Sequence, residues 1–91
     1  MAQARVIVLN STEKDMGEGW TLCFQYCRYH LTSKEQEGYR FIWKTPEGRL
    51  QPARGQARIP SIADALKLIS EAMRLGWGNK NGDNAGFEYE V

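Results

Sequence analysis

The pattern of hydrophobic and polar residues predicts short strands through the first half of the chain and a single helix after them. Most of the strand candidates are rich in β-branched or aromatic residues, and most of them alternate apolar with polar positions. These candidates are residues 5–9, 20–31, 39–44, 49–53 and 87–91. The alternation of the second candidate blurs after Tyr26, and a bulge near Cys27 or Arg28 would restore its register. The polar stretches 10–19 and 32–38 are expected to be loops.

The helix is predicted between Ser61 and Gly76, because a start signal and a stop signal are both present there. The Ser61 hydroxyl can accept a hydrogen bond from a free amide of the first turn, and Asp64 is placed as in a capping box. Gly76 can adopt the left-handed conformation that ends many helices. Apolar residues recur between these ends at helical spacing, on one stripe that we expect to face the sheet. The stripe consists of Ile62, Leu66, Ile69 and Met73.

Two further leucines of this helix, Leu68 and Leu75, fall nearly opposite the stripe. With Trp77 just beyond the helix end, they would form a second apolar contact surface. We therefore interpret Leu68, Leu75 and Trp77 as a self-association surface, across which two copies would pack their helices about a two-fold axis.

These elements predict an α+β fold in a single domain that spans residues 1–91. An antiparallel sheet of four to five strands would carry one helix, about residues 61–76, on one face. Pro52 cannot donate a ladder hydrogen bond, so the strand at 49–53 is expected at an edge. The strand alternation predicts that Trp20, Leu22, Phe24, Phe41 and Trp43 face the helix.

The net charge is only +1, which excludes a strongly basic nucleic-acid binder, but one segment is locally basic. Between residues 39 and 58, five basic residues and one acidic residue leave a local charge of +4. Aromatic residues are interleaved with them, a mixture that suits base stacking and phosphate contact. The strand alternation puts the aromatic and basic residues on opposite faces, which favours a solvated hairpin and linker. The candidate anion or nucleic-acid contacts are Arg40, Lys44, Arg49, Arg54 and Arg58.

No residue pattern predicts catalysis, a metal site or a cofactor. Cys27 and His30 are an odd number of residues apart, so on a regular strand they point to opposite faces and do not form a nucleophile–base pair. The two cysteines and one histidine are too few for a zinc site. Cys23 and Cys27 would lie about 13 Å apart on one strand, too far for a disulfide. They predict reduced thiols in a cytoplasmic protein, and the apolar run at the amino end is too short to span a membrane.

Residues 39–78 combine a hairpin with the run Arg-Gly-Gln-Ala-Arg-Ile-Pro-Ser and a Gly-Trp-Gly end to the helix. In these features the chain resembles small uncharacterised bacterial proteins carried on mobile elements such as integron cassettes and prophages. The resemblance covers less than half of the chain and implies a bacterial, cytoplasmic accessory protein. It implies no activity and no site residue.

The sequence therefore favours a small non-catalytic binding or interaction module whose partner is a second copy, as a homodimer, or another protein. The alternative is nucleic-acid or anion binding through residues 40–58. A small enzyme is the third hypothesis, and it would need carboxylates that converge in a pocket no pattern predicts.

Overall fold

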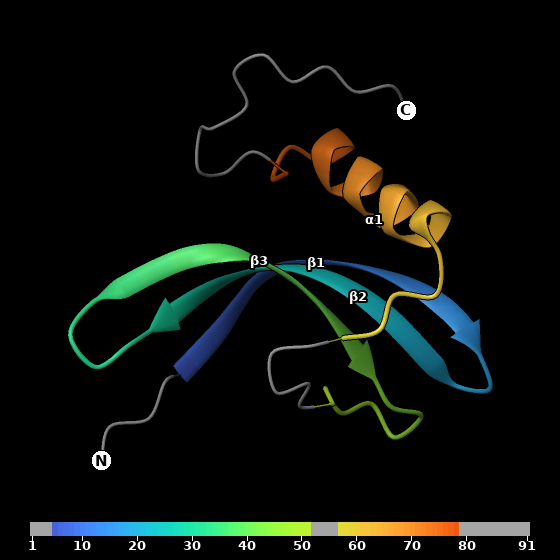
Figure 1. Cartoon of the computed structure of the whole chain (residues 1–91), viewed down its shortest axis with the longest axis horizontal. Helices are drawn as coiled ribbons and strands as arrows, with labels where there is room; N and C mark the ends of the chain where they lie inside the picture. The colour runs from blue at the N-terminus through green and yellow to red at the C-terminus, as the bar shows by residue number, and fades with distance from the viewer. Residues whose placement is uncertain (1–4, 52–56, 79–91) are drawn as a thin grey trace.

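The computed structural model describes residues 5–51 and 57–78, which fold as an antiparallel sheet with a helix on one face (Figure 1). The elements are β1 (Arg5–Gly17), β2 (Trp20–His30), β3 (Glu35–Lys44) and α1 (Ile62–Arg74). Strand β2 is central and pairs antiparallel with both neighbours. The predicted α+β class, with an antiparallel sheet and one helix, is confirmed.

Strands β1 and β3 both extend into stretches that were predicted as loops. Residues 10–17 continue β1, and residues 35–38 begin β3. Most of these residues are polar and have weak strand propensity, but all except Met16 pair with a residue of the long strand β2, and cross-strand pairing outweighs local preference. A two-residue turn joins β1 to β2, in which Glu18 and Gly19 have φ values of 56° and 86°, as a type I′ turn requires.

The pairing of β1 with β2 shifts register close to where the sequence predicts a bulge. Val8 pairs with Cys27 and Asn10 pairs with Tyr26, so Leu9 has no direct partner on β2. The pairing of β2 with β3 runs through the same region without a shift. The extra residue therefore belongs to β1, and the prediction that placed it on β2 was wrong about the strand.

Only part of the predicted fourth strand lies within the described residues. Leu50 forms an isolated bridge with Lys44, and the Gln51 amide donates a hydrogen bond of 2.8 Å to the Trp43 carbonyl. The predicted fifth strand, residues 87–91, lies outside the described residues. The described sheet has three strands, and the predicted number of four to five is not confirmed.

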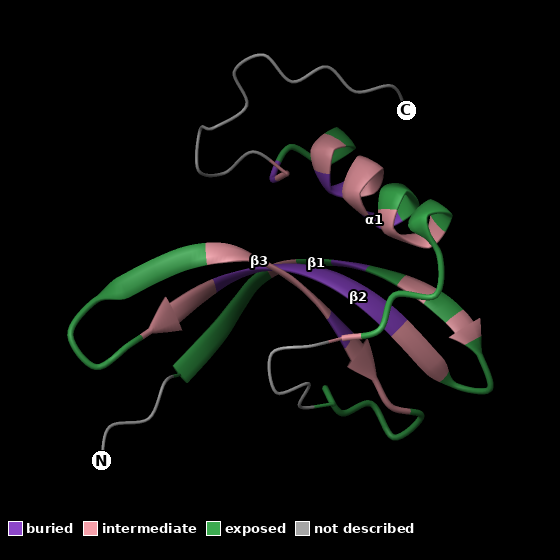
Figure 2. Ribbon diagram, viewed as in Figure 1, coloured by how far each residue is buried: buried purple, intermediate pink, exposed green. Residues whose placement is uncertain are grey.

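The core lies between the sheet and the helix, where the middle of β2 and part of α1 are buried (Figure 2). It is built around the aromatic side chains of β2 and β3. The Phe24 ring lies at the centre, with ring centroids 4.8 Å from Phe41, 5.6 Å from Tyr39 and 5.8 Å from Trp77. The buried cluster is Leu22, Phe24, Tyr26, Leu68, Ala72 and Trp77. Four of the predicted helix-facing residues, Leu22, Phe24, Phe41 and Trp43, lie in or against it.

The helix face that packs on the sheet overlaps the predicted stripe only in part, since Ile69 packs against the core cluster and two other members of the stripe are exposed. Leu68 is 1% exposed, whereas Leu66 of the predicted stripe is 57% exposed and Ile62 is 79% exposed. The buried face is rotated by roughly a quarter turn from the predicted stripe. The aromatic rings of the sheet fill the space beneath the helix, so the small residue Ala72 lies at the contact. Polar contacts with β1 hold this orientation, since the Thr12 hydroxyl donates a hydrogen bond of 3.1 Å to the Leu68 carbonyl.

Both predicted ends of the helix are confirmed in detail. The Ser61 hydroxyl accepts a hydrogen bond from the Asp64 amide. At the other end, Gly76 has a φ of 93°, and the Trp77 amide donates to the Ala72 carbonyl as in a Schellman motif. This turn directs Trp77 back beneath the helix, where its side chain is buried. The expectation that Leu68 and Trp77 face outward is therefore wrong.

Candidate functional site

Two of the predicted basic contacts lie on the face of β3 opposite the helix, and each has a polar partner there. The Arg40 Nε donates a hydrogen bond of 3.0 Å to the Gln25 Oε1. The Lys44 Nζ lies 2.9 Å from the Glu13 Oε2, and this hydrogen bond raises the pKa of Lys44. These contacts across the sheet hold the two side chains over the central strand, and Glu13 also offsets the charge of Lys44.

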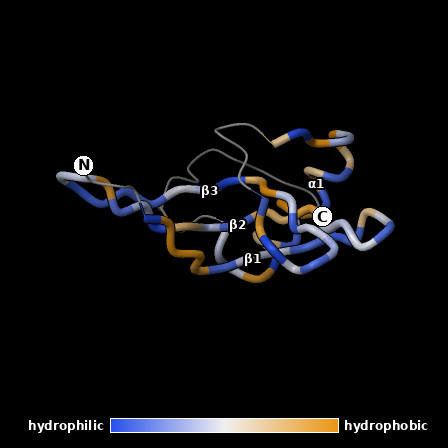
Figure 3. The backbone as a smooth tube through the Cα atoms, turned by 90° about the horizontal axis from the view of Figure 1, so that it is seen from below, coloured by the Kyte–Doolittle hydropathy of each residue, from blue (hydrophilic) through white to orange (hydrophobic). Residues whose placement is uncertain are grey.

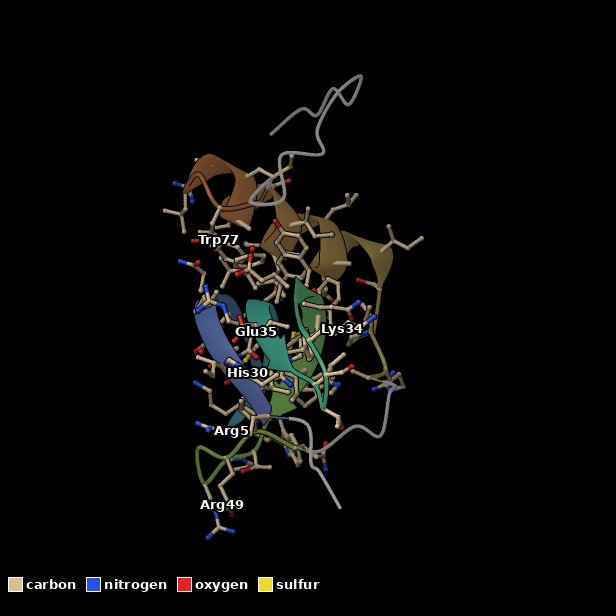
Figure 4. The ribbon with its side chains drawn as sticks, turned by 90° about the vertical axis from the view of Figure 1, so that its left-hand side faces the viewer. Arg5, His30, Lys34, Glu35, Arg49 and Trp77 are labelled. Atoms are coloured by element: carbon tan, nitrogen blue, oxygen red, sulfur yellow. The ribbon has the colours of Figure 1, made fainter. Side chains whose placement is uncertain are left out.

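The other predicted basic contacts lie elsewhere in the chain. Arg49 ends the turn after β3 and extends from the end of the molecule, far from Trp77 (Figure 4). Arg58 precedes the helix, and its carbonyl accepts a hydrogen bond of 2.8 Å from the Trp43 Nε1. Arg54 lies outside the described residues. Among the described members of the set, only Arg40 and Lys44 share a strand.

The residues predicted for self-association do not form one exposed surface. Leu68 and Trp77 are buried in the core, and only Leu75 is exposed. Sequence spacing placed Leu68 and Leu75 on one side of the helix, but Leu68 packs into the core, whereas Leu75 lies at the C-cap and stays exposed.

The two cysteines occupy the face of the sheet opposite the helix, at the centre of β2. Both thiols are free and fully buried. Burial raises the pKa of Cys23 to about 11 and also raises the pKa of Cys27. Neither thiol is therefore present as the reactive thiolate at neutral pH.

Ionisable side chains also gather at the far end of the β2–β3 hairpin, on the helix side of the sheet. Arg28 contacts Glu37 through two nitrogens at 3.0 Å, and the His30 Nδ1 lies 2.9 Å from the Glu35 Oε2. The Tyr26 hydroxyl donates a hydrogen bond to Glu37, which raises the pKa of Tyr26 to about 12. These groups pair with one another across the two strands. Within residues 5–51 and 57–78, no three His, Cys, Asp or Glu side chains are grouped as metal ligands would be.

The outer face of α1 carries a shallow, open depression of ≈ 560 Å³. Its lining residues are Ala63, Leu66, Lys67, Ser70, Glu71 and Arg74. All of them belong to one helix, so the depression has no opposing wall that could enclose a small molecule.

An exposed apolar stretch at the edge of the sheet was missed by the sequence reasoning. It is the first part of β1, Arg5–Leu9, which we call the β1 edge segment. Val6, Ile7, Val8 and Leu9 are each between 37% and 40% exposed. Strand β1 pairs with β2 on one side only, so it forms one edge of the described sheet.

The β1 edge segment lies away from the helix. The helix packs over the other end of the sheet, beyond the register shift, whereas the β2–β3 hairpin and the beginning of β1 extend away from it (Figures 1 and 3). A signal for this surface was present in the sequence. Four large apolar residues in succession give a strand two apolar faces, and a single helix on a sheet covers only one of them.

No helix in the described part of the chain is long and apolar enough to cross a membrane. Comparisons with known protein families, curated proteins and solved structures found no match.

Proposed function

We propose that the protein is a small non-catalytic interaction module whose contact surface is the β1 edge segment. The observation that carries this proposal is the exposure of Val6, Ile7, Val8 and Leu9, all between 37% and 40%. An edge strand also presents unpaired backbone donors and acceptors, and an extended segment of a partner can pair with them. Main-chain pairing would supply affinity there, and the apolar side chains would add contact area.

Contrast with the other edge of the sheet supports the choice of β1. Strand β3 begins with Glu35 and Glu37 and carries Arg40 and Lys44, and charged side chains discourage pairing with a foreign strand. The chain itself covers the end of β3, since the Gln51 amide bonds to the Trp43 carbonyl. Positions 6–9 of β1 carry no charge and no proline.

The environment we propose for this module is the cytoplasm. Its two thiols are free, and a reducing compartment keeps thiols in that state. An accessory role in a bacterial cell, as the resemblance to mobile-element proteins implies, fits a domain that acts by contact.

Site-specific photo-crosslinking tests the proposal. A benzophenone amino acid would replace Ile7 in one variant and Leu66 in a control variant, and both would be expressed in the cells that naturally produce the chain. Leu66 is a matched control because it is an exposed apolar residue on the helix, away from the edge. We expect defined protein adducts from position 7 that disappear when Val6 and Val8 are also changed to Lys. Equal adducts from both positions, or none from position 7, would contradict the proposal.

A further inference from the structure

We infer that the partner of the β1 edge segment is a second copy of this chain, paired antiparallel through Arg5–Leu9 about a two-fold axis at Ile7. The inference rests on the proposed function, because it names the occupant of the same surface. The resulting dimer would have one continuous sheet that joins the three described strands of each copy.

The exposure pattern of the segment favours a strand as the occupant. Val8 lies opposite Cys27 on the face away from the helix, and Ile7 lies opposite Arg28 on the helix side. A strand with one covered face would alternate between buried and exposed residues. Here residues on both faces are equally exposed, at 37–40%. A strand added at the edge places its own side chains beside those on both faces of β1, whereas a globular surface docked on one face would leave the side chains of the other face exposed.

The sequence of the segment favours a second copy as the source of that strand. Val6-Ile7-Val8 reads the same in both directions, so an antiparallel partner with its axis at Ile7 meets an identical set of side chains. Ile7 would face Ile7, and Val6 would face Val8 twice. Residues directly opposite each other in an antiparallel pair lie on the same face, and this register satisfies that condition at all three positions.

Charge and geometry are compatible with this register. The two Arg5 side chains would lie about 14 Å apart along the strands, beyond the distance at which physiological salt screens most of their repulsion. The net charge of +1 per chain adds little further repulsion. Beyond Val8 the register shift at Leu9 and the polar residues that follow end the self-complementary run. The axis would stand perpendicular to the sheet, so the faces are not exchanged and both helices lie on the same side.

Disulfide trapping tests the register directly. Ile7→Cys should form a covalent dimer with itself under mild oxidation by diamide, and Val6→Cys mixed with Val8→Cys should form a mixed dimer. Directly opposite residues of an antiparallel pair alternate between a shorter and a longer Cα–Cα distance. One of these two tests therefore places its cysteines at the shorter distance, which suits a disulfide. Leu66→Cys is the control for random collision, and Cys23 and Cys27 are buried and should not react. Intact mass and non-reducing electrophoresis identify the products, and circular dichroism checks the fold.

We expect the Ile7→Cys variant, or the mixture of Val6→Cys with Val8→Cys, to form covalent dimer about tenfold faster than Leu66→Cys or more. Strand pairing would hold the two thiols together at high effective concentration. Sedimentation of the wild type from about 10 µM to about 1 mM should show reversible dimer, the range expected for a small interface. Ile7→Lys should remain a folded monomer. Edge cysteines that react no faster than the control, or a wild type that is monomeric throughout, would overturn self-pairing. If position 7 nevertheless crosslinks to a different protein in cells, the proposed function stands and only the second copy is excluded.

Discussion

Replacing Leu68 by alanine tests the orientation of the helix on the sheet. Leu68 is 1% exposed and belongs to the core cluster, so the substitution removes buried methyl groups and leaves a cavity. Leu→Ala changes at such sites cost about 2–5 kcal/mol of unfolding free energy. A value of about 3 kcal/mol is reasonable here, because the rigid rings of Phe24 and its neighbours cannot collapse fully into the space. The Thr12 hydroxyl donates its hydrogen bond to the backbone carbonyl of residue 68, so the bond does not depend on the Leu68 side chain and should survive the change.

Leu66→Ala is the matched control, because it deletes the same atoms two residues away on the same helix. Leu66 is 57% exposed, and alanine is the stronger helix former, so its cost should stay below about 1 kcal/mol. Urea denaturation followed by circular dichroism measures both differences. In thermal unfolding, Leu68→Ala should lower Tm by roughly 10–25 °C for a domain of this size. A larger cost at Leu66 than at Leu68 would show that the helix packs with the opposite face.

Three further outcomes follow from the described contacts. Cys23 should resist alkylation by iodoacetamide at pH 8 in the folded protein and should react readily once urea unfolds the chain. Rapid labelling of Cys23 without denaturant would contradict its burial. Because folding raises the pKa of Tyr26 from 10.0 to about 12, its contribution to stability is complete below pH 10 and is lost as the pH rises towards 12. Tyr26→Phe should therefore lose less stability than the wild type over that pH range, and parallel curves would argue against the Glu37 hydrogen bond as the cause. Ser61→Ala should cost about 1 kcal/mol in urea denaturation through loss of the helix cap, and an unchanged midpoint would mean that the Asp64 amide finds another partner.

Features of the fold that depend on a few neighbouring residues could be predicted from the sequence. Ser61 and Gly76 mark the helix ends because capping depends on the backbone within one turn. The alternation of Leu22 and Phe24 identifies the core face of β2 because strand geometry is local.

Features that depend on distant residues could not be predicted in the same way. The helix has apolar residues on two sides, at Leu66 and at Leu68, so its pattern alone does not decide which side is buried. That choice depends on the size of the rings on the sheet and on Thr12, which is 56 positions away from Leu68. The strand at residues 10–17 is mostly polar and forms because β2 offers a partner to each of its residues except Met16.

The candidate site was missed for a related reason. Residues 5–9 were correctly predicted as a strand, but their exposure depends on which strand lies at the edge and where the helix ends. The prediction of self-association through Leu68, Leu75 and Trp77 followed from the misassigned helix face. A second copy as partner stays a proposal, with its contact moved to the β1 edge segment.

The proposed contact between two copies of this chain lies at the β1 edge segment. Amide chemical shifts of the isotope-labelled full chain, followed by NMR over a dilution series, test it most directly. We predict that the amides of Arg5–Leu9 shift with concentration, that those of β3 and α1 stay nearly constant, and that Ile7→Lys abolishes the change. Concentration-dependent shifts confined to the outer face of α1 or to residues 40–51 would contradict it.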